Sequence, residues 1–145
     1  MGNMKVKEAV EEIARISAKW QKRLVECVEC EEGANEKHSW AEWATWHLQD
    51  ILVAERLVAE WRVIENAAKQ AHTHDDAATF LGWLKGVRGQ YVGWIMQSTL
   101  SRSTNLISNL VKDIEMDTYK MIAGHGFLDS DSLFVVIAKM EREKE

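Results

Sequence analysis

Two cysteines, Cys27 and Cys30, could bind a zinc ion together with a nearby histidine. Thiolate and imidazole are the usual ligands of structural zinc, and His38 lies closest along the chain, with His47 as a further candidate. The spacing of this set is irregular, so the alternative is that Cys27 is a core residue of a helix. A pair only three residues apart does not staple a secreted fold, which favours a reducing, cytoplasmic compartment.

A second set of candidate metal ligands is spread over the chain. It consists of His47, the adjacent His74 and Asp75, and Asp113. The order of these residues resembles that in HD-type metal phosphohydrolases, in which histidines and aspartates hold divalent metal ions that activate water. The resemblance implies a metal-dependent hydrolase with these four catalytic residues. The alternative is that Asp75 and Asp76 lie at a helix start, where carboxylates stabilise the helix dipole, and that His47 is hydrogen-bonded within a helix seam.

A stripe of glycines is the sharpest feature of the sequence. Gly82, Gly86, Gly89 and Gly93 are spaced four, three and four residues apart. In a helix they lie within roughly 60° of one another, on one face. Each costs about 1 kcal/mol relative to alanine, so the stripe costs roughly 4 kcal/mol, and some contact should offset it. Larger residues occupy the opposite face, which should pack into the chain's own core: Phe80, Leu84, Val87 and Tyr91.

Three occupants could use such a smooth face. The first is another helix of the same chain, which would approach more closely than usual. The second is a copy of the same helix in another subunit. The third is an anionic ligand beside Lys85 and Arg88. Close approach of a backbone is the physical use of a smooth helix face in all three cases.

The charges are unevenly distributed along the chain. Residues 1–76 carry 10 basic and 15 acidic side chains, and residues 113–145 carry 4 and 8. Residues 77–112 contain no acid, although they contain Lys85, Arg88, Arg102 and Lys112. This asymmetry predicts a site for an anionic ligand or nucleic acid at Lys85, Arg88 and Arg102. The alternative is that the segment lacks acids because most of it is core.

The surrounding elements are predicted to be helices. The chain has no proline, 46% of its residues are apolar, and apolar residues recur at three- and four-residue intervals. Ser39 with Glu42 and Thr73 with Asp76 have the spacing of capping boxes, which mark helix starts. Residues 98–105 form either a turn or part of one long helix. The predicted helices run from about Lys5 to Glu31, Ser39 to Ala71, Thr73 to Gln97, residue 106 to Gly124, and Asp129 or Ser130 onward.

The sequence therefore predicts one all-α domain over residues 1–145. We expect a largely antiparallel bundle of four main helices plus a short C-terminal helix, with no cofactor. No stretch approaches the roughly 18 apolar residues of a membrane helix. The favoured function is non-enzymatic: an interaction module that binds a second copy, or another protein, through the four glycines. Anion or nucleic-acid binding and metal-dependent hydrolysis are the alternatives.

Overall fold

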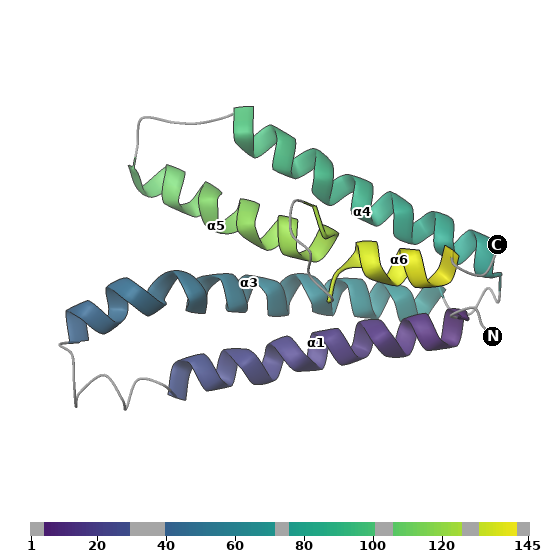
Figure 1. The fold of residues 1–145 in the computed structure, drawn as a ribbon, viewed down its shortest axis with the longest axis horizontal. Coiled ribbons are helices and arrows are strands. Elements are labelled where there is room, and N and C mark those ends of the chain that lie inside the picture. The colour runs from purple at the N-terminus through teal and green to yellow at the C-terminus, as the bar shows by residue number, and fades with distance from the viewer. Residues whose placement is uncertain (1–4, 30–39, 72–75, 101–105, 126–130, 142–145) are drawn as a thin grey trace.

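The computed structural model describes residues 5–29, 40–71, 76–100, 106–125 and 131–141, and these residues form helices without any strand. From α1 to α5, consecutive helices run in opposite directions, whereas α6 runs in the same direction as α5 (Figure 1). The predicted all-α bundle, with four main helices and a short C-terminal helix, is therefore confirmed. The helices are α1 (Val6–Glu29), α3 (Trp40–Ala71), α4 (Ala77–Leu100), α5 (Leu106–Ala123) and α6 (Leu133–Glu141).

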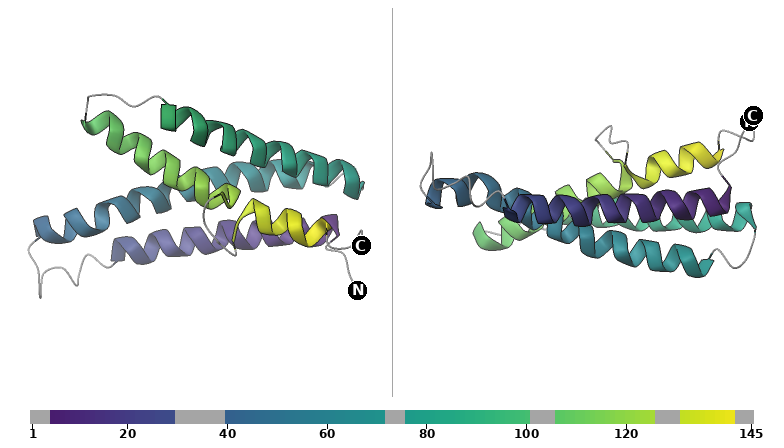
Figure 2. Two further views of the ribbon diagram at one scale, coloured as in Figure 1. Left: turned by 45° about the horizontal axis from the view of Figure 1, so that its top comes forward. Right: turned by 90° about the horizontal axis from the view of Figure 1, so that it is seen from below.

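The helices are arranged as two antiparallel pairs joined at one end. α1 packs on α3, α4 packs on α5, and the pairs meet where α3 contacts α5. The short α6 contacts α1, α4 and α5, and it lies at the end of the bundle that holds both termini (Figures 1 and 2). Toward the opposite end the two pairs diverge. The helix α6 therefore closes the bundle between α1 and α4.

One apolar core connects all five helices. Trp61 of α3 is fully buried in it, as are Ile13 and Ile16 of α1 and Leu84 of α4. These residues recur at helical spacing, so each helix buries one face and leaves the other to solvent. Within the described residues, no helix is both long and apolar enough to cross a membrane.

Two polar contacts tie α3 to the α4–α5 pair. The Tyr91 hydroxyl of α4 donates a 2.7 Å hydrogen bond to a Glu60 carboxylate oxygen of α3. Arg56 of α3 donates to the Tyr119 hydroxyl of α5 over 3.1 Å. Burial, together with the Glu60 carboxylate, raises the pKa of Tyr91, so that phenol remains a neutral donor. The first contact thus attaches α4 to α3, and the second attaches α5 to α3.

The start of α4 differs from the prediction. The helix begins at Ala77, and Asp76 is its N-cap: the Asp76 carboxylate accepts hydrogen bonds from the Ala78 backbone amide and the Thr79 hydroxyl. The expected start at Thr73, with Asp76 as the third residue of a capping box, is therefore wrong. Aspartate is itself among the strongest N-cap residues, which explains why the helix starts here. Residues 98–100 belong to α4, whereas residues 101–105, on which the choice between a turn and one long helix depends, lie outside the described residues.

The end of α5 follows the prediction, whereas α6 begins later than expected. Gly124 has a φ of 70°, and its amide and that of His125 both donate to the Lys120 carbonyl, as in a glycine-capped helix end. The helix α6 begins at Leu133 rather than near Asp129 or Ser130, which lie outside the described residues. The apolar run of this helix predicts four buried residues, Leu133, Phe134, Val136 and Ile137. Three of them are buried, but Phe134 is 51% exposed, and Met140 is buried as well.

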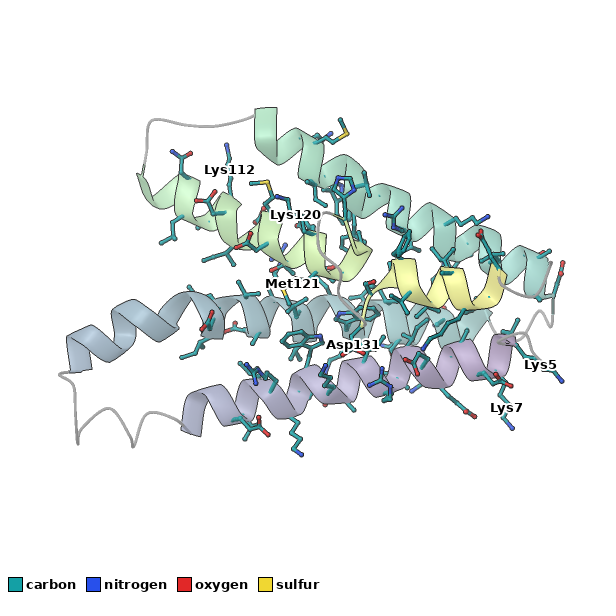
Figure 3. All side chains as sticks on the ribbon, viewed as in Figure 1. Lys5, Lys7, Lys112, Lys120, Met121 and Asp131 are labelled. Atoms are coloured by element: carbon teal, nitrogen blue, oxygen red, sulfur yellow. The ribbon has the colours of Figure 1, made fainter. Side chains whose placement is uncertain are left out.

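A buried carboxylate attaches the start of α6 to α1. Asp131 is 5% exposed and accepts hydrogen bonds from Arg15, over 2.7 Å, and from Lys19 (Figure 3). Burial alone would raise the pKa of Asp131, but the hydrogen bonds from Lys19 and Arg15 outweigh it and hold the pKa below its ordinary value. The carboxylate therefore stabilises the folded state in its charged form.

We predict that Asp131→Asn lowers the free energy of unfolding by about 1–3 kcal/mol at neutral pH, because it removes a charge that pairs with two cations. The pKa of Asp131 is lower in the folded protein than in the unfolded chain, where an aspartate has a pKa of about 3.9. The charged carboxylate therefore stabilises the fold fully above that pH, and this stabilisation is lost as the pH falls below it. The difference between the variant and the wild type should therefore shrink below about pH 4. Urea titrations from pH 2.5 to 7 test this, and a difference that stays constant over that range would contradict it.

Candidate functional site: the glycine face of α4

The helix α4 has one bulky and one smooth face, and the structure places the bulky face in the core. Phe80, Leu84 and Tyr91 are buried, and Val87 packs against the core cluster. This confirms the prediction that these four residues face the protein's own interior. Other large apolar residues of α4 stay at the surface, since Trp94 is 40% exposed and Met96 is 62% exposed.

The smooth face, which we call the glycine face, consists of Gly82, Gly86, Gly89 and Gly93. All four glycines are exposed, and among the described residues no other helix or side chain lies within 4 Å of a methyl group placed on any of them. No helix that the structure describes therefore lies against this face, which contradicts the alternative of a neighbouring helix from the same chain. The reason is geometric: α5 and α6 contact α4 on the sides that bear its bulky residues.

The two ends of this face differ in bulk. Ala78 and Thr79, both small and exposed, precede the first glycine by one turn. Met96 follows the last glycine and is 62% exposed. Gln90 is exposed beside the central glycines. The sequence reasoning missed Met96, although it lies at a three-residue spacing from Gly93 and could have been found from that spacing.

The basic residues near the glycine face already have partners within the chain. Lys85 forms an ion pair with Glu141 of α6 over 2.5 Å. Arg88 donates a 2.7 Å hydrogen bond to the Ala123 carbonyl at the end of α5, and its guanidinium lies 5.2 Å from the centre of the Phe134 ring. Arg88 thus points toward α5 and α6, not toward an open anion site. Arg102 lies outside the described residues.

The predicted metal ligands are only partly described. Cys27 lies on α1, whereas Cys30 and His38 are outside the described residues. For the hydrolase set, His47 lies on α3 and the half-buried Asp113 on α5, whereas His74 and Asp75 are outside them. Across the described ranges, no three histidine, cysteine, aspartate or glutamate side chains come together as a metal site.

No family model matches the chain, and no curated protein or solved structure matches it significantly.

Proposed function

We propose that the protein is a non-enzymatic helical module that self-associates through the glycine face of α4. The observation that supports this is the cost of four helical glycines, roughly 4 kcal/mol, which no contact with the described part of the chain offsets. A second subunit could offset it, because bare backbone lets two helix axes approach closer than the usual distance of about 8–10 Å. We place this assembly in the cytoplasm, on the evidence of the cysteine spacing.

The spacing of the glycines favours an antiparallel pair of α4 helices. The order four, three, four reads the same in both directions, so a two-fold axis between residues 87 and 88 would place Gly82 opposite Gly93 of the partner subunit. It would place Gly86 opposite the partner subunit's Gly89. The bulky end at Met96 and Gln97 would then lie over the partner's small end, where the first glycine is preceded by alanine and threonine.

A parallel pair would bring each residue against its own copy. Met96 would then oppose a second exposed methionine and hold the helices apart at that end. In the antiparallel pair, Met96 lies over the partner's small end instead. Shape therefore favours the antiparallel arrangement, whereas Lys85 does not decide between the two, because its charge is already paired with Glu141.

The test is to fill the glycine face. We predict that the double substitution Gly86→Leu with Gly89→Leu yields a folded monomer, because leucine meets open space within the chain but would keep two subunits apart. The monomer should also be more stable, by about 1 kcal/mol for each glycine replaced. Light scattering measures the mass, and urea denaturation under monomeric conditions measures stability.

The matched control is Ala59→Leu, which adds leucine at an exposed position of α3. This variant should keep the wild-type mass. A wild-type protein that is monomeric at about 100 μM, a concentration at which micromolar affinity would be visible, would contradict self-association. So would a double variant that assembles as the wild type does.

A cross-linking experiment tests the register separately. In a background with both natural cysteines replaced by serine, Ala78→Cys and Gln97→Cys proteins are mixed and oxidised. The antiparallel pair predicts disulfide-linked heterodimers between the two variants, because the two positions are equally far from the two-fold axis. A parallel pair would instead link each variant to itself.

A further inference from the structure

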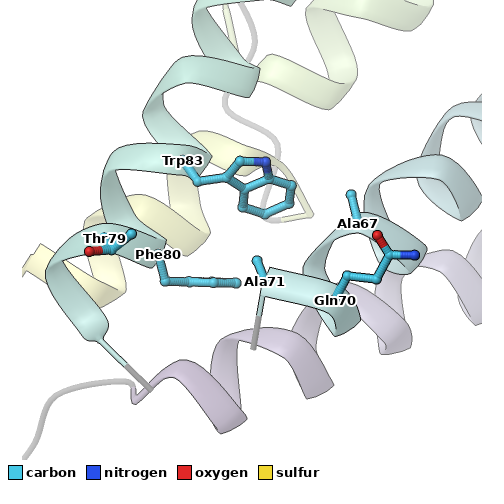
Figure 4. A pocket seen from close by; sticks show the side chains of 6 residues that line it. All are labelled: Ala67, Gln70, Ala71, Thr79, Phe80 and Trp83. Atoms are coloured by element: carbon cyan, nitrogen blue, oxygen red, sulfur yellow. The ribbon is translucent and has the colours of Figure 1, made fainter. Parts of the chain in front are cut away.

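A concave surface lies between the start of α4 and the end of α3. Its lining consists of three residues of α3 and three of α4: Ala67, Gln70, Ala71, Thr79, Phe80 and Trp83. Figure 4 shows Phe80 and Trp83 reaching from α4 toward the two alanines of α3. The hollow measures about 350 Å³, at the small end of the roughly 300–1,000 Å³ typical of ligand pockets.

The hollow arises from the residue sizes on the two helices. The alanines of α3 leave space opposite the large side chains of α4, and the Phe80 and Trp83 rings lie 5.4 Å apart and tilted, forming one aromatic wall. None of the six lining residues is charged. The nearby Lys69 forms an ion pair with Glu65 over 2.9 Å. The carboxylate of Asp76, beside Thr79, already accepts hydrogen bonds from the Ala78 amide and the Thr79 hydroxyl. Aromatic and methyl walls, with no charged residue among the described lining, disfavour an ion because they cannot compensate the cost of desolvating a charge.

We propose that this pocket binds a small, neutral aromatic molecule of one or two rings. A cavity of about 150 Å³ is enough to bind benzene, so 350 Å³ accommodates a fused pair of rings. Aromatic pairs favour tilted or offset arrangements, which the exposed part of Trp83 offers. The Gln70 amide and the Thr79 hydroxyl supply polar atoms to the lining. The Thr79 hydroxyl donates its proton to Asp76, so its oxygen remains as an acceptor. Thr79 also lies at the small end of the glycine face, whereas the other five lining residues are not part of that face.

Indole is a suitable probe, with indole-3-acetate and tryptamine as its charged analogues. Titration followed by amide and indole N–H nuclear magnetic resonance should give saturable shifts at Ala71, Thr79 and Trp83, with a Kd at or below about 1 mM. Each charged analogue should bind at least tenfold more weakly. Equal binding of all three compounds, shifts that do not saturate, or shifts that centre on other residues would overturn the proposal.

Two substitutions that fill the pocket test whether indole binds there. Ala71→Leu, and separately Ala67→Leu, should weaken indole binding at least tenfold while the melting temperature stays equal or rises, because leucine occupies the hollow. Ala59→Leu, at an exposed position of the same helix, should leave binding unchanged. Wild-type affinity in either filled variant that retains the native spectrum would place the binding elsewhere and overturn the proposal.

Discussion

Trp61→Ala is expected to lower the free energy of unfolding by about 3–5 kcal/mol, which is enough to unfold a domain of ordinary stability. The Trp61 side chain is fully buried, and it belongs to the core cluster that joins all five helices. Alanine would leave a void that the surrounding helices can fill only in part. Urea denaturation followed by circular dichroism measures the loss.

Trp61→Phe is the matched control, and it should cost much less. Phenylalanine keeps an aromatic ring in the core, and the indole N–H that it lacks donates no hydrogen bond to the residues that the structure describes. A loss below about 1 kcal/mol for Trp61→Ala would contradict the assigned place of this residue in the core.

The helices and the bulky face of α4 could be predicted because both depend on local periodicity. Apolar spacing identified the buried residues Phe80, Leu84 and Tyr91 before any neighbour was known. Helix boundaries were harder, because Thr73 and Asp76 are both good caps and the sequence does not rank them. Phe134 was misassigned for a related reason: a short apolar run such as that of α6 does not indicate which of its sides meets the core.

The surroundings of the candidate site depend on tertiary contacts that sequence spacing does not contain. The segment without acids is an example, since Glu141, far along the chain, supplies the carboxylate that pairs with Lys85. Asp131 likewise meets Arg15 across an interval of 116 residues. The glycine face was recognisable from spacing alone, but only the packing of the other helices determines that it is left uncovered.

The junction between α5 and α6 lies against the bulky face of α4. Gly124, at the end of α5, packs closely against residues at the start of α6. Gly124 adopts a φ of 70°, in the left-handed region that L side chains rarely occupy. A Cβ at this position would lie 2.5 Å from the Ser132 hydroxyl oxygen and 2.7 Å from the Phe134 Cβ. Ser132 accepts a hydrogen bond from the Val135 amide at the start of α6, so displacing it would disturb that helix as well.

Gly124→Ala should therefore lower the free energy of unfolding by about 2–4 kcal/mol, combining the left-handed backbone cost with overpacking against α6. The same substitution at Gly82 is the matched control, because its Cβ would enter open space on a helix. Gly82→Ala should raise the stability of the subunit by about 1 kcal/mol through helix propensity. Urea denaturation of both variants under monomeric conditions gives the comparison. If the two substitutions changed the free energy of unfolding equally and in the same direction, α6 would not pack against the end of α5 as described. A loss of stability for Gly124→Ala together with a gain for Gly82→Ala would support both the tight junction at Gly124 and the uncovered face at Gly82.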